Sequence, residues 1–294
     1  MPDGPLLTIA MPVFNGGPHL RMAVLSIVQQ SFTDWELLLI DDGSTDGAIE
    51  ELADLADSRI HVIRDGRNRG LAARLNEALG LARGCYFARM DADDISHPER
   101  FSQQLAVLKS DQSVDLLGSR CMTISTHNEI LGTLPFKESH RDICSRPWLG
   151  FYLPHPTWVG KTAWFRTHHY AEPGPYCCED QELLLRAHYS SHFHALSDIL
   201  LAYRLRDRLV WRKACRTRVT LFRIQFNHFV TRKNYAFAVL ATVATVLRLG
   251  RDFLTFLRQF RTGAARSSAG VLSVGSEEAE HWQRWIRRLE GRNT

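Results

Sequence analysis

The sequence predicts an α/β fold, in which a mostly parallel sheet with flanking helices is followed by a basic helical C-terminal region. Over the first hundred residues, short apolar runs alternate with segments of helical periodicity. The apolar runs are continuous, which is typical of strands covered on both faces. Residues 204–294 contain 19 Lys and Arg against 6 Asp and Glu, although the net charge of the whole chain is only +4. The positive charge is therefore concentrated in the C-terminal region.

The predicted elements of the N-terminal part follow the order of a βαβ series. Strands are predicted over residues 6–11, 36–41, 60–63 and 85–90, and helices over residues 18–30, 46–56 and 70–82. Right-handed crossovers bring the carboxyl ends of parallel strands to one edge, where ligands bind in such sheets. Asp41 and Asp42 end the second strand, and the segment "DADD" (91–94) follows the fourth. Both acidic clusters are therefore expected to project into one crevice.

The acidic residues at this edge predict a divalent-cation site. No G-x-G-x-x-G follows the first strand and no G-x-x-x-x-G-K-[ST] occurs in the sequence, which argues against dinucleotide and P-loop sites. Carboxylates hold a phosphate only through a cation, and their hard oxygens suit Mg²⁺ or Mn²⁺, which complete their shell with diphosphate oxygens and water. The alternative is a solvated turn that caps the next helix through Ser96. A cap needs only one short polar side chain, so it leaves the crowding of carboxylates unexplained.

The C-terminal region predicts helices that lie on a surface. Apolar residues recur at steps of three and four beside a row of arginines, at Trp211, Cys215, Val219, Phe222, Phe226 and Phe229. Residues 234–247 are uncharged, but as a helix they would extend only about 21 Å, against the ~30 Å of a bilayer core. The excess of basic residues favours an anionic membrane surface as partner. Packing of these helices on the rest of the chain or on a second subunit is the alternative.

The beginning of the chain and its cysteines favour a cytoplasmic location. The first residues turn into a strand-like pattern without the features of an export signal. The six cysteines form no C-x-x-C pair, so reduced thiols are expected. Together with the basic C-terminal region, this predicts a peripheral protein on the inner face of the cytoplasmic membrane.

Four separated segments resemble the inverting family-2 glycosyltransferases of GT-A fold, which is Rossmann-like. They are "TIAMPVFNG", "ELLLIDDGSTDG", "NRGLAARLNEALGLARGCYFARMDADDISHPERFSQQ" and "CCEDQELLLRA", in the order typical of that family. The resemblance covers about residues 6–206. It implies a catalytic domain over residues 1–206, with a nucleotide-sugar-binding half (1–118) and an acceptor-binding half (119–206). Residues 207–294 remain as a basic amphipathic helical region.

The resemblance implies which residues bind the donor and the metal. The donor-binding residues would be Pro12, Val13, Asn15, Asp41, Arg74, Asn76 and Asp91. Asp41 would accept a hydrogen bond from the base, which suits the imide N–H of uracil or thymine. Asp91-Ala92-Asp93 matches the D-x-D motif of the family. Asp93 is the expected direct ligand of Mn²⁺ or Mg²⁺, and Asp91 would face the ribose or the metal.

The resemblance also implies the residues of the transfer step. Inversion needs a base that takes the proton of the attacking hydroxyl, a role that falls to Asp180, while Glu179 would orient the acceptor. Both would begin a helix, whose dipole keeps an acid ionised; an ordinary acidic first turn is the alternative. His155 matches a segment near the acceptor. Arg206 stands where many relatives have the His of a Tyr-Arg-x-His, and an arginine there could contact the diphosphate.

The resemblance thus implies an enzyme that moves a sugar from a UDP- or dTDP-linked donor to a hydroxyl group of a saccharide or lipid-linked saccharide acceptor, in cell-surface polysaccharide or glycolipid synthesis. Two other classes stay open. A sugar-nucleotide nucleotidyltransferase would carry a basic residue in its Gly-rich loop, which "MPVFNGG" lacks. A non-catalytic, membrane-associated partner of the same fold would have degraded motifs, whereas the D-x-D and the Glu-Asp pair are intact. No nucleic acid partner is expected, because no recognised binding module accompanies the basic charge.

Overall fold

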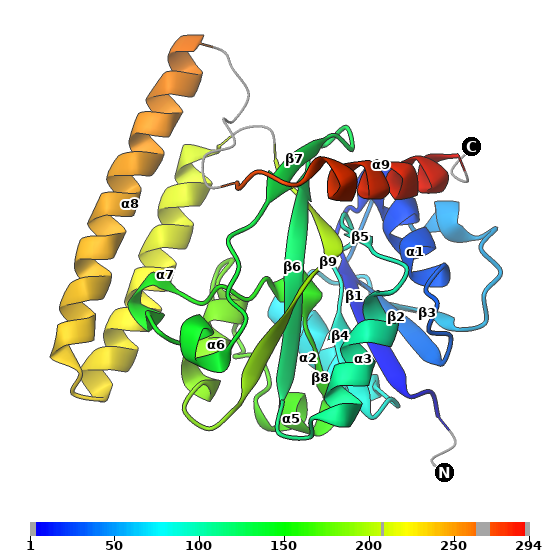
Figure 1. Cartoon of the computed structure of the whole chain (residues 1–294), viewed down its shortest axis with the longest axis horizontal. Coiled ribbons are helices and arrows are strands. Elements are labelled where there is room, and N and C mark those ends of the chain that lie inside the picture. Colours follow the sequence, from blue (N-terminus) through cyan, green and yellow to red (C-terminus); the bar gives the residue numbers. More distant parts are fainter. Residues whose placement is uncertain (1–3, 207–208, 263–270, 292–294) are drawn as a thin grey trace.

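One mixed β-sheet forms the centre of the computed structural model, which describes residues 4–206, 209–262 and 271–291 (Figure 1). Among the described residues the sheet has nine strands in the order β3-β2-β1-β4-β8-β6-β9-β5, with β7 paired to β6. The strands are β1 (Leu7–Val13), β2 (Trp35–Asp41), β3 (Ile60–Arg64), β4 (Tyr86–Arg89), β5 (Ile95–Ser96), β6 (Leu116–Ile124), β7 (Ile130–Thr133), β8 (Val159–Lys161) and β9 (Phe193–Arg204).

The N-terminal half of this sheet is parallel, as the sequence predicts. β1 lies between β2 and β4 and runs parallel to both, and β3 runs parallel to β2. Val13 pairs with Asp41, so the carboxyl ends of β1 and β2 finish side by side. β1 and β2 are almost fully buried because helices cover both of their faces, which explains their continuous apolar runs.

The second half of the sheet mixes both directions. β8 runs antiparallel to β4 and to β6, and β5 runs antiparallel to β9, whereas β6 and β9 are parallel. The fold is therefore a mixed α/β sheet, and the apolar runs predict only the parallel strands β1 to β4. β8 has three residues and β5 has two, which is too short for a periodicity signal.

Helices cover the two faces of the sheet through separate apolar clusters. Leu20 of α1 and Phe101 of α3 pack on one face, and Leu75 of α2, Trp164 of α5 and Leu184 of α6 pack on the other. These helices are α1 (Leu20–Val28), α2 (Leu71–Leu81), α3 (Arg100–Ser110), α5 (Thr162–Thr167) and α6 (Glu179–Ala187), with a short α4 (His140–Ile143) between β7 and β8. The predicted helices over residues 18–30 and 70–82 correspond to α1 and α2.

The helix predicted over residues 46–56 is wrong, since the segment contains only the single 3-10 turn Glu50–Leu52. The side chain of Asp46 accepts hydrogen bonds from the backbone N–H groups of Gly17, at 2.7 Å, and Ala48, at 3.3 Å. Gly47 has a φ of 76°, outside the helical region. These bonds, one within the segment and one to the chain that follows β1, hold the segment as a loop.

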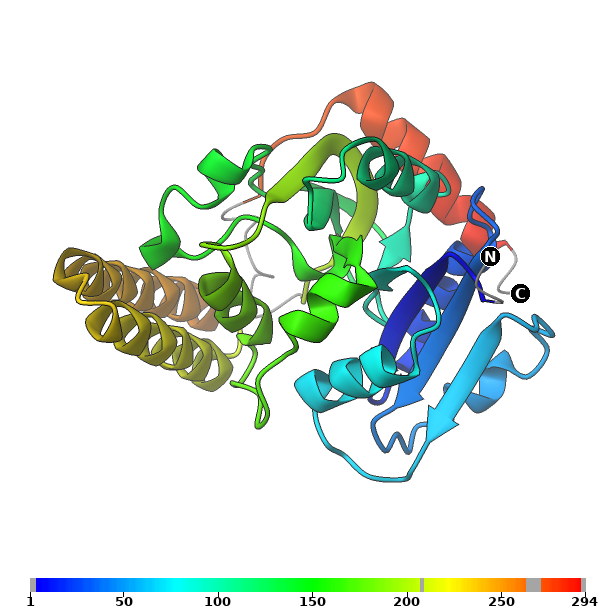
Figure 2. The same cartoon turned by 90° about the horizontal axis from the view of Figure 1, so that it is seen from below.

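Helices α7 (Trp211–Thr231) and α8 (Tyr235–Thr262) form a hairpin beside the sheet (Figures 1 and 2). Phe229 and Ala238 on its inner side belong to the apolar cluster of α2 and α6. The buried Gln225 donates to the carbonyl of Pro147 at 2.8 Å, and Arg248 donates to that of Leu149 at 2.7 Å. The hairpin is thus attached to the rest of the chain by its inner side. None of the described helices combines the length and the apolarity needed to cross a bilayer.

Helix α9 (Ser276–Glu290) returns to the sheet and lies beside α1 (Figures 1 and 2). Trp282, Trp285 and Ile286 are buried in a cluster with Met22 of α1 and Ile95 of β5. The indole N–H of Trp285 also donates to the carbonyl of Ser96 at 3.0 Å. The predicted region 207–294 therefore contains the hairpin and a helix that packs on the sheet. Residues 207 and 208, at its predicted beginning, lie outside the described residues.

Candidate active site

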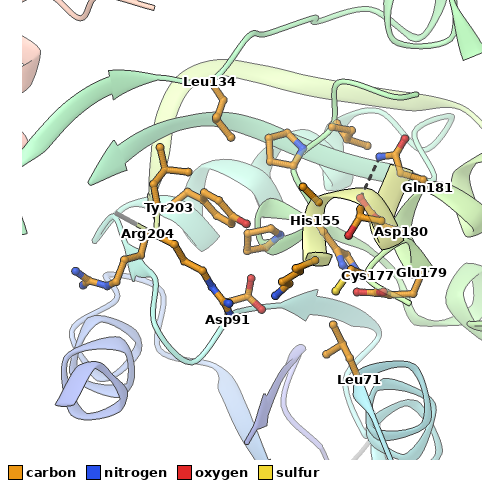
Figure 3. Close-up of a pocket in the computed structure, with 18 of the residues that line it drawn as sticks. Leu71, Asp91, Leu134, His155, Cys177, Glu179, Asp180, Gln181, Tyr203 and Arg204 are labelled. Atoms are coloured by element: carbon orange, nitrogen blue, oxygen red, sulfur yellow. Dashed lines mark hydrogen bonds between the residues drawn. The ribbon is translucent and has the colours of Figure 1, made fainter. Parts of the chain in front are cut away.

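A cavity of about 780 Å³ lies where β4, β9, α6 and the beginning of α7 meet (Figure 3). Figure 3 shows Asp91 and Arg204 on one side of it and Glu179 and Asp180 on the other. Six site residues expected from the resemblance line this cavity: Asp91, Asp93, His155, Glu179, Asp180 and Arg206. The fold thus brings the D-x-D loop and the Glu179–Asp180 pair, which are far apart in the sequence, together at the edge where ligands bind in such sheets.

Asp91 is held by a buried arginine at the end of β4. Arg89 is only 3% exposed, and both of its terminal nitrogens contact the carboxylate of Asp91, one of them at 2.8 Å from Oδ2. Burial raises the pKa of Asp91, and the charge of Arg89 opposes this shift. Arg89 therefore favours the ionised form of Asp91, whereas burial alone would favour the protonated form.

Arg204, the last residue of β9, fixes the shape of the acidic loop. Its backbone N–H donates to Oδ1 of Asp94, and its Nε donates to the carbonyl of Asp93, both at 2.8 Å. Its Nη1 donates to the carbonyl of Ser125 and to Oδ1 of Asn128, also at 2.8 Å. Burial raises the pKa of Asp94 well above its ordinary value, and neighbouring Asp91 and Asp93 raise it further. Asp94 is thus an anchor of the loop.

Sequence reasoning did not assign Arg89 or Arg204 to the site. The sequence does contain a signal for both residues. In "CYFARMDADD" Arg89 ends β4 directly before the acidic loop, and in "AYRLRD" Arg204 ends β9 two residues before Arg206. An arginine at the carboxyl end of a buried strand has few partners except the loop that follows or adjoins it.

Asp93 is the carboxylate of this loop that remains available to a cation. Its side chain is exposed, lines the cavity and forms no ion pair within the described chain. No group of three or more His, Cys, Asp or Glu side chains gathers around a possible metal position in the described residues. Asp93, with Asp91 beside it, fits a Mn²⁺ or Mg²⁺ that takes one or two carboxylates and completes its shell with diphosphate oxygens and water.

Glu179 and Asp180 begin α6 on the opposite side of the cavity. Oδ2 of Asp180 accepts a hydrogen bond from Nε2 of Gln181 at 3.0 Å, and Oε1 of Gln181 accepts one from the backbone N–H of Phe151 at 2.8 Å. Burial raises the pKa of Asp180, and the bonds from Gln181 oppose the shift. Burial and the charge of Asp180 raise the pKa of Glu179 to about 7. Such a pair can accept and hold a proton near neutral pH.

His155 lies in the floor of the cavity as a neutral ring. Its Nε2 is 2.7 Å from the hydroxyl of Tyr170, and its ring packs on Trp158 at 4.5 Å between centroids. Burial, together with the charge of Arg89, lowers the pKa of His155 well below its ordinary value. Asn76 of α2 holds the backbone of Tyr170. Its Oδ1 accepts a hydrogen bond from the N–H of Tyr170 at 3.0 Å, and its Nδ2 donates to the carbonyl of Tyr170 at 2.9 Å. Asn76 therefore supports the position of His155 from outside the cavity.

The expected base-binding residues lie at the ends of β1 and β2, outside this cavity. Pro12 and Val13 end β1. Asn15 follows with a φ of 51° and accepts a hydrogen bond from the backbone N–H of Thr45 at 2.9 Å. Oδ1 of Asp41 accepts one from the backbone N–H of Ser44 at 2.8 Å. The loops after the two strands are thus bound to each other.

Arg74 is fully buried on α2 and binds three carboxylates. Its Nε donates to Oδ1 of Asp42 at 2.9 Å and its Nη1 to Oε2 of Glu77 at 2.8 Å, and a third ion pair joins it to Asp65. The backbone N–H groups of Arg69 and Gly70 bind the same Asp42. In the structure Arg74 therefore holds the loop between β3 and α2 against the end of β2.

The glycosyl transferase family 2 profile matches residues 8–169. A putative glycosyltransferase of Bacillus subtilis, EpsE, is 38% identical over 122 residues, which cover 40% of this chain and 44% of the relative. An Escherichia coli UDP-Glc:alpha-D-GlcNAc-diphosphoundecaprenol beta-1,3-glucosyltransferase, WfgD, is 29% identical over 130 residues, 44% of this chain and 51% of the relative. The matches span about half the length of these curated relatives or less.

Solved structures share the fold at low sequence identity. S. aureus TarS in complex with UDP has a TM-score of 0.58 and 20% identity, with 94% of this chain and 77% of that chain covered. The mannosyltransferase PcManGT from Pyrobaculum calidifontis, solved with GDP-Man and Mn²⁺, has a TM-score of 0.62 and 15% identity, with 99% and 87% covered. The superposed length includes the C-terminal helices as well as the sheet.

Replacement of Arg204 by Gln is expected to lower the free energy of unfolding by about 2–4 kcal/mol, because it removes the bonds of a buried guanidinium to the carbonyls of Asp93 and Ser125. Urea denaturation measures the effect. Arg206→Gln is the matched control, since this side chain is exposed and should change stability by less than about 0.5 kcal/mol. Equal midpoints for the two variants would contradict the anchoring role of Arg204.

Proposed function

The chain belongs to glycosyltransferase family 2, and from this premise we propose that it transfers a sugar, with inversion, from a nucleoside-diphosphate sugar to a hydroxyl group of an acceptor. The carrying observation is that the D-x-D loop and the Glu179–Asp180 pair line one cavity from opposite sides. One side can hold a leaving diphosphate through a cation, and the other can take the proton of the incoming hydroxyl.

The donor would bind with its base at the ends of β1 and β2 and its diphosphate at the D-x-D loop. Pro12, Val13 and Asn15 would border the base and ribose, and Asp41 would accept the imide N–H of a uracil or thymine. UDP occupies the TarS structure, which supports a uridine donor. Arg74 supports this half of the site through the loop that it holds.

Asp93 is the proposed direct ligand of Mn²⁺ or Mg²⁺, and Asp91 is its neighbour. When bound, the cation supplies charge that stabilises the departing nucleoside diphosphate. Asp91 is already neutralised by Arg89, so it would orient ribose or water at the cation while Asp93 binds the cation itself. PcManGT was solved with Mn²⁺, which supports a divalent ion in this fold.

Asp180 is the proposed base, with Glu179 beside it to orient the acceptor. The bond from Gln181 fixes the carboxylate, and its raised pKa increases its affinity for a proton. His155 and Arg206 line the same cavity and would contact acceptor or diphosphate. The name of WfgD describes an acceptor saccharide on a lipid diphosphate, and we propose a saccharide or lipid-linked saccharide acceptor here, in cell-surface polysaccharide or glycolipid synthesis.

The outer side of α8 is the proposed contact with an anionic membrane on its cytoplasmic side. Large apolar side chains on it are more than half exposed: Tyr235, Val239, Val243, Val246, Leu247, Leu254 and Phe260. Arg232 and Lys233 are exposed at the turn before the helix, and Arg251 and Arg261 are exposed in its second half. An apolar helix face bordered by cations is typical of interfacial helices, which gain about 1 kcal/mol per basic residue near anionic lipid.

Asp93→Ala should abolish metal-dependent donor binding while the chain stays folded, because the exposed carboxylate contributes to the cation site and not to the core. Calorimetry with UDP and Mn²⁺ measures the affinity. Asp198→Ala, which removes an exposed acid of β9 outside the cavity, is the control and should bind as the original chain does. Unchanged affinity of the Asp93 variant would exclude this residue as the ligand.

Asp180→Asn should lower turnover by roughly 10²- to 10⁴-fold with nearly unchanged donor affinity, because it keeps the shape and removes the proton acceptor. The original enzyme should lose kcat/KM on the acid side at a pH above ~4, the pKa of an ordinary aspartate, because burial raises the pKa of Asp180 and its protonated form cannot act as base. Steady-state rates across pH measure both effects.

Glu182→Gln is the matched control for Asp180→Asn. Glu182 lies on the same helix but pairs with Arg186 at 2.7 Å outside the cavity, so its replacement should leave turnover within about twofold. If Asp180→Asn also retained turnover within a few-fold, the base would have to be another residue.

The double variant Val243→Glu/Leu247→Glu should release the chain from anionic vesicles, because it places two negative charges in a face that is now 51% and 68% exposed at these side chains. Co-sedimentation with phosphatidylglycerol vesicles measures this, and high salt should weaken binding of the original chain. Val62→Glu/Leu81→Glu is the control, since these apolar side chains are exposed on β3 and at the end of α2 and not on α8. Equal pelleting of both double variants would contradict membrane contact through α8.

A further inference from the structure

The cavity extends beyond the acidic residues to a basic wall formed by the end of β9 and by the hairpin. Its lining includes Arg206 after β9, and Lys213 and Arg218 on α7, together with Asp252 of α8. The acids of the D-x-D loop and of α6 line the remainder. One continuous space therefore has a wall of carboxylates and a wall of cations, contributed by segments that are far apart in the sequence.

Most of the cations around this space already have partners. Arg89 is bound to Asp91, and Arg204 is bound to backbone carbonyls and Asn128. Arg218 donates to Oδ2 of Asp252 at 2.9 Å, and Asp252 is only 5% exposed. Arg206 and Lys213 differ from these cations, because no carboxylate of the described residues lies within ion-pair distance of either.

Lys213 lacks a carboxylate partner among the described residues although it lies inside the cavity wall. The side chain is half-buried and lines the cavity, and no carboxylate of the described residues lies within ion-pair distance of its ammonium group. Arg212, the preceding residue of the same helix, is instead exposed and does not line the cavity. An anionic group bound in the cavity could form charge-assisted hydrogen bonds with both Lys213 and Arg206.

We propose that Arg206 and Lys213 form a subsite for a phosphate or diphosphate group carried by the acceptor. This inference rests on the proposed function, in which the donor diphosphate is held through the cation at Asp93. The charge of the donor diphosphate would thus be neutralised by the cation at the acidic wall. Arg206 and Lys213 of the basic wall would then be available to bind a second anion. The acceptor hydroxyl would lie between the two walls, within reach of Asp180.

The construction of the wall favours an acceptor attached to a lipid. Val210 and Ala214 line the cavity beside Lys213 and provide apolar surface next to the cations. The same hairpin presents the exposed apolar side of α8 that we propose as the membrane contact. Cys178, next to the Glu179–Asp180 pair, contacts the carbonyl of Thr217 on α7 at 3.6 Å, and Arg216 lies 3.8 Å over the ring of Tyr176. Membrane contact, basic wall and proposed base are therefore parts of one packed unit.

Binding of inorganic pyrophosphate without divalent metal tests the subsite, because the acidic wall repels this anion when no cation is present. Calorimetry should detect binding to the full-length chain. Each of Arg206→Glu and Lys213→Glu should weaken it at least tenfold, the effect expected for the loss of one charge-assisted hydrogen bond. Arg212→Glu makes the same charge change one residue away from Lys213 and should alter the affinity by less than about threefold.

A second titration with UDP and Mn²⁺ separates acceptor phosphate from donor diphosphate. Lys213→Glu should keep the affinity for UDP within about threefold of the original chain. If UDP affinity fell as much as pyrophosphate affinity, the cations would belong to the donor site and the proposal would be overturned. It would also be overturned if pyrophosphate did not bind, or bound equally to all variants. Absence of UDP binding in every chain, with the expected pyrophosphate pattern, would refute the proposed uridine donor and leave the subsite standing.

Discussion

The crowding of carboxylates at one sheet edge is the constraint on which the rest of the site depends. Asp91, Asp93 and Asp94 lie within one short loop, and Glu179 and Asp180 face them across the cavity. Burial raises the pKa of Asp94 and of Glu179, and the negative charges of the neighbouring carboxylates raise it further. The structure opposes this with two buried arginines, Arg89 and Arg204, each of which ends a strand. The two strands thereby deliver the counter-charges that keep the acidic loop in place.

The division of work among the three aspartates follows from these contacts. Asp94 is buried and bonded to the backbone of Arg204, so it belongs to the framework. Asp91 is bound on one side by Arg89 and open to the cavity on the other. Asp93 is exposed and therefore retains the full capacity of its carboxylate for a cation. A cluster that looks uniform in sequence thus contains a buried anchor, an acid paired with an arginine and an exposed acid without an ion pair among the described residues.

The C-terminal helices complete the site from outside the sheet. α9 covers α1 and β5 with a tryptophan-rich cluster, whereas the hairpin packs its inner side on α6 and on the segment before it. Because α7 lines the cavity, part of the cavity wall comes from a helix that belongs to none of the family motifs. The hairpin carries an exposed apolar surface on α8 and lines, through α7, the same cavity as Asp180, so the proposed membrane contact and the proposed base belong to adjoining parts of the fold.

The sequence by itself determined the parallel half of the sheet, the acidic edge and the two acidic motifs. The first two features follow from local pattern, since buried parallel strands give continuous apolar runs and their carboxyl ends must share one edge, whereas the Glu179–Asp180 motif was identified through the resemblance to the family. The helix predicted over residues 46–56 failed because the side chain of Asp46 bonds to Gly17, a contact across 29 positions that no local pattern contains. Tertiary structure alone decided that Arg204 binds the loop at Asp93 and Asp94, that Arg74 is buried among three carboxylates, and that Lys213 enters the cavity. Each of these depends on which distant segment lies beside the side chain, and that is fixed only when the whole chain packs.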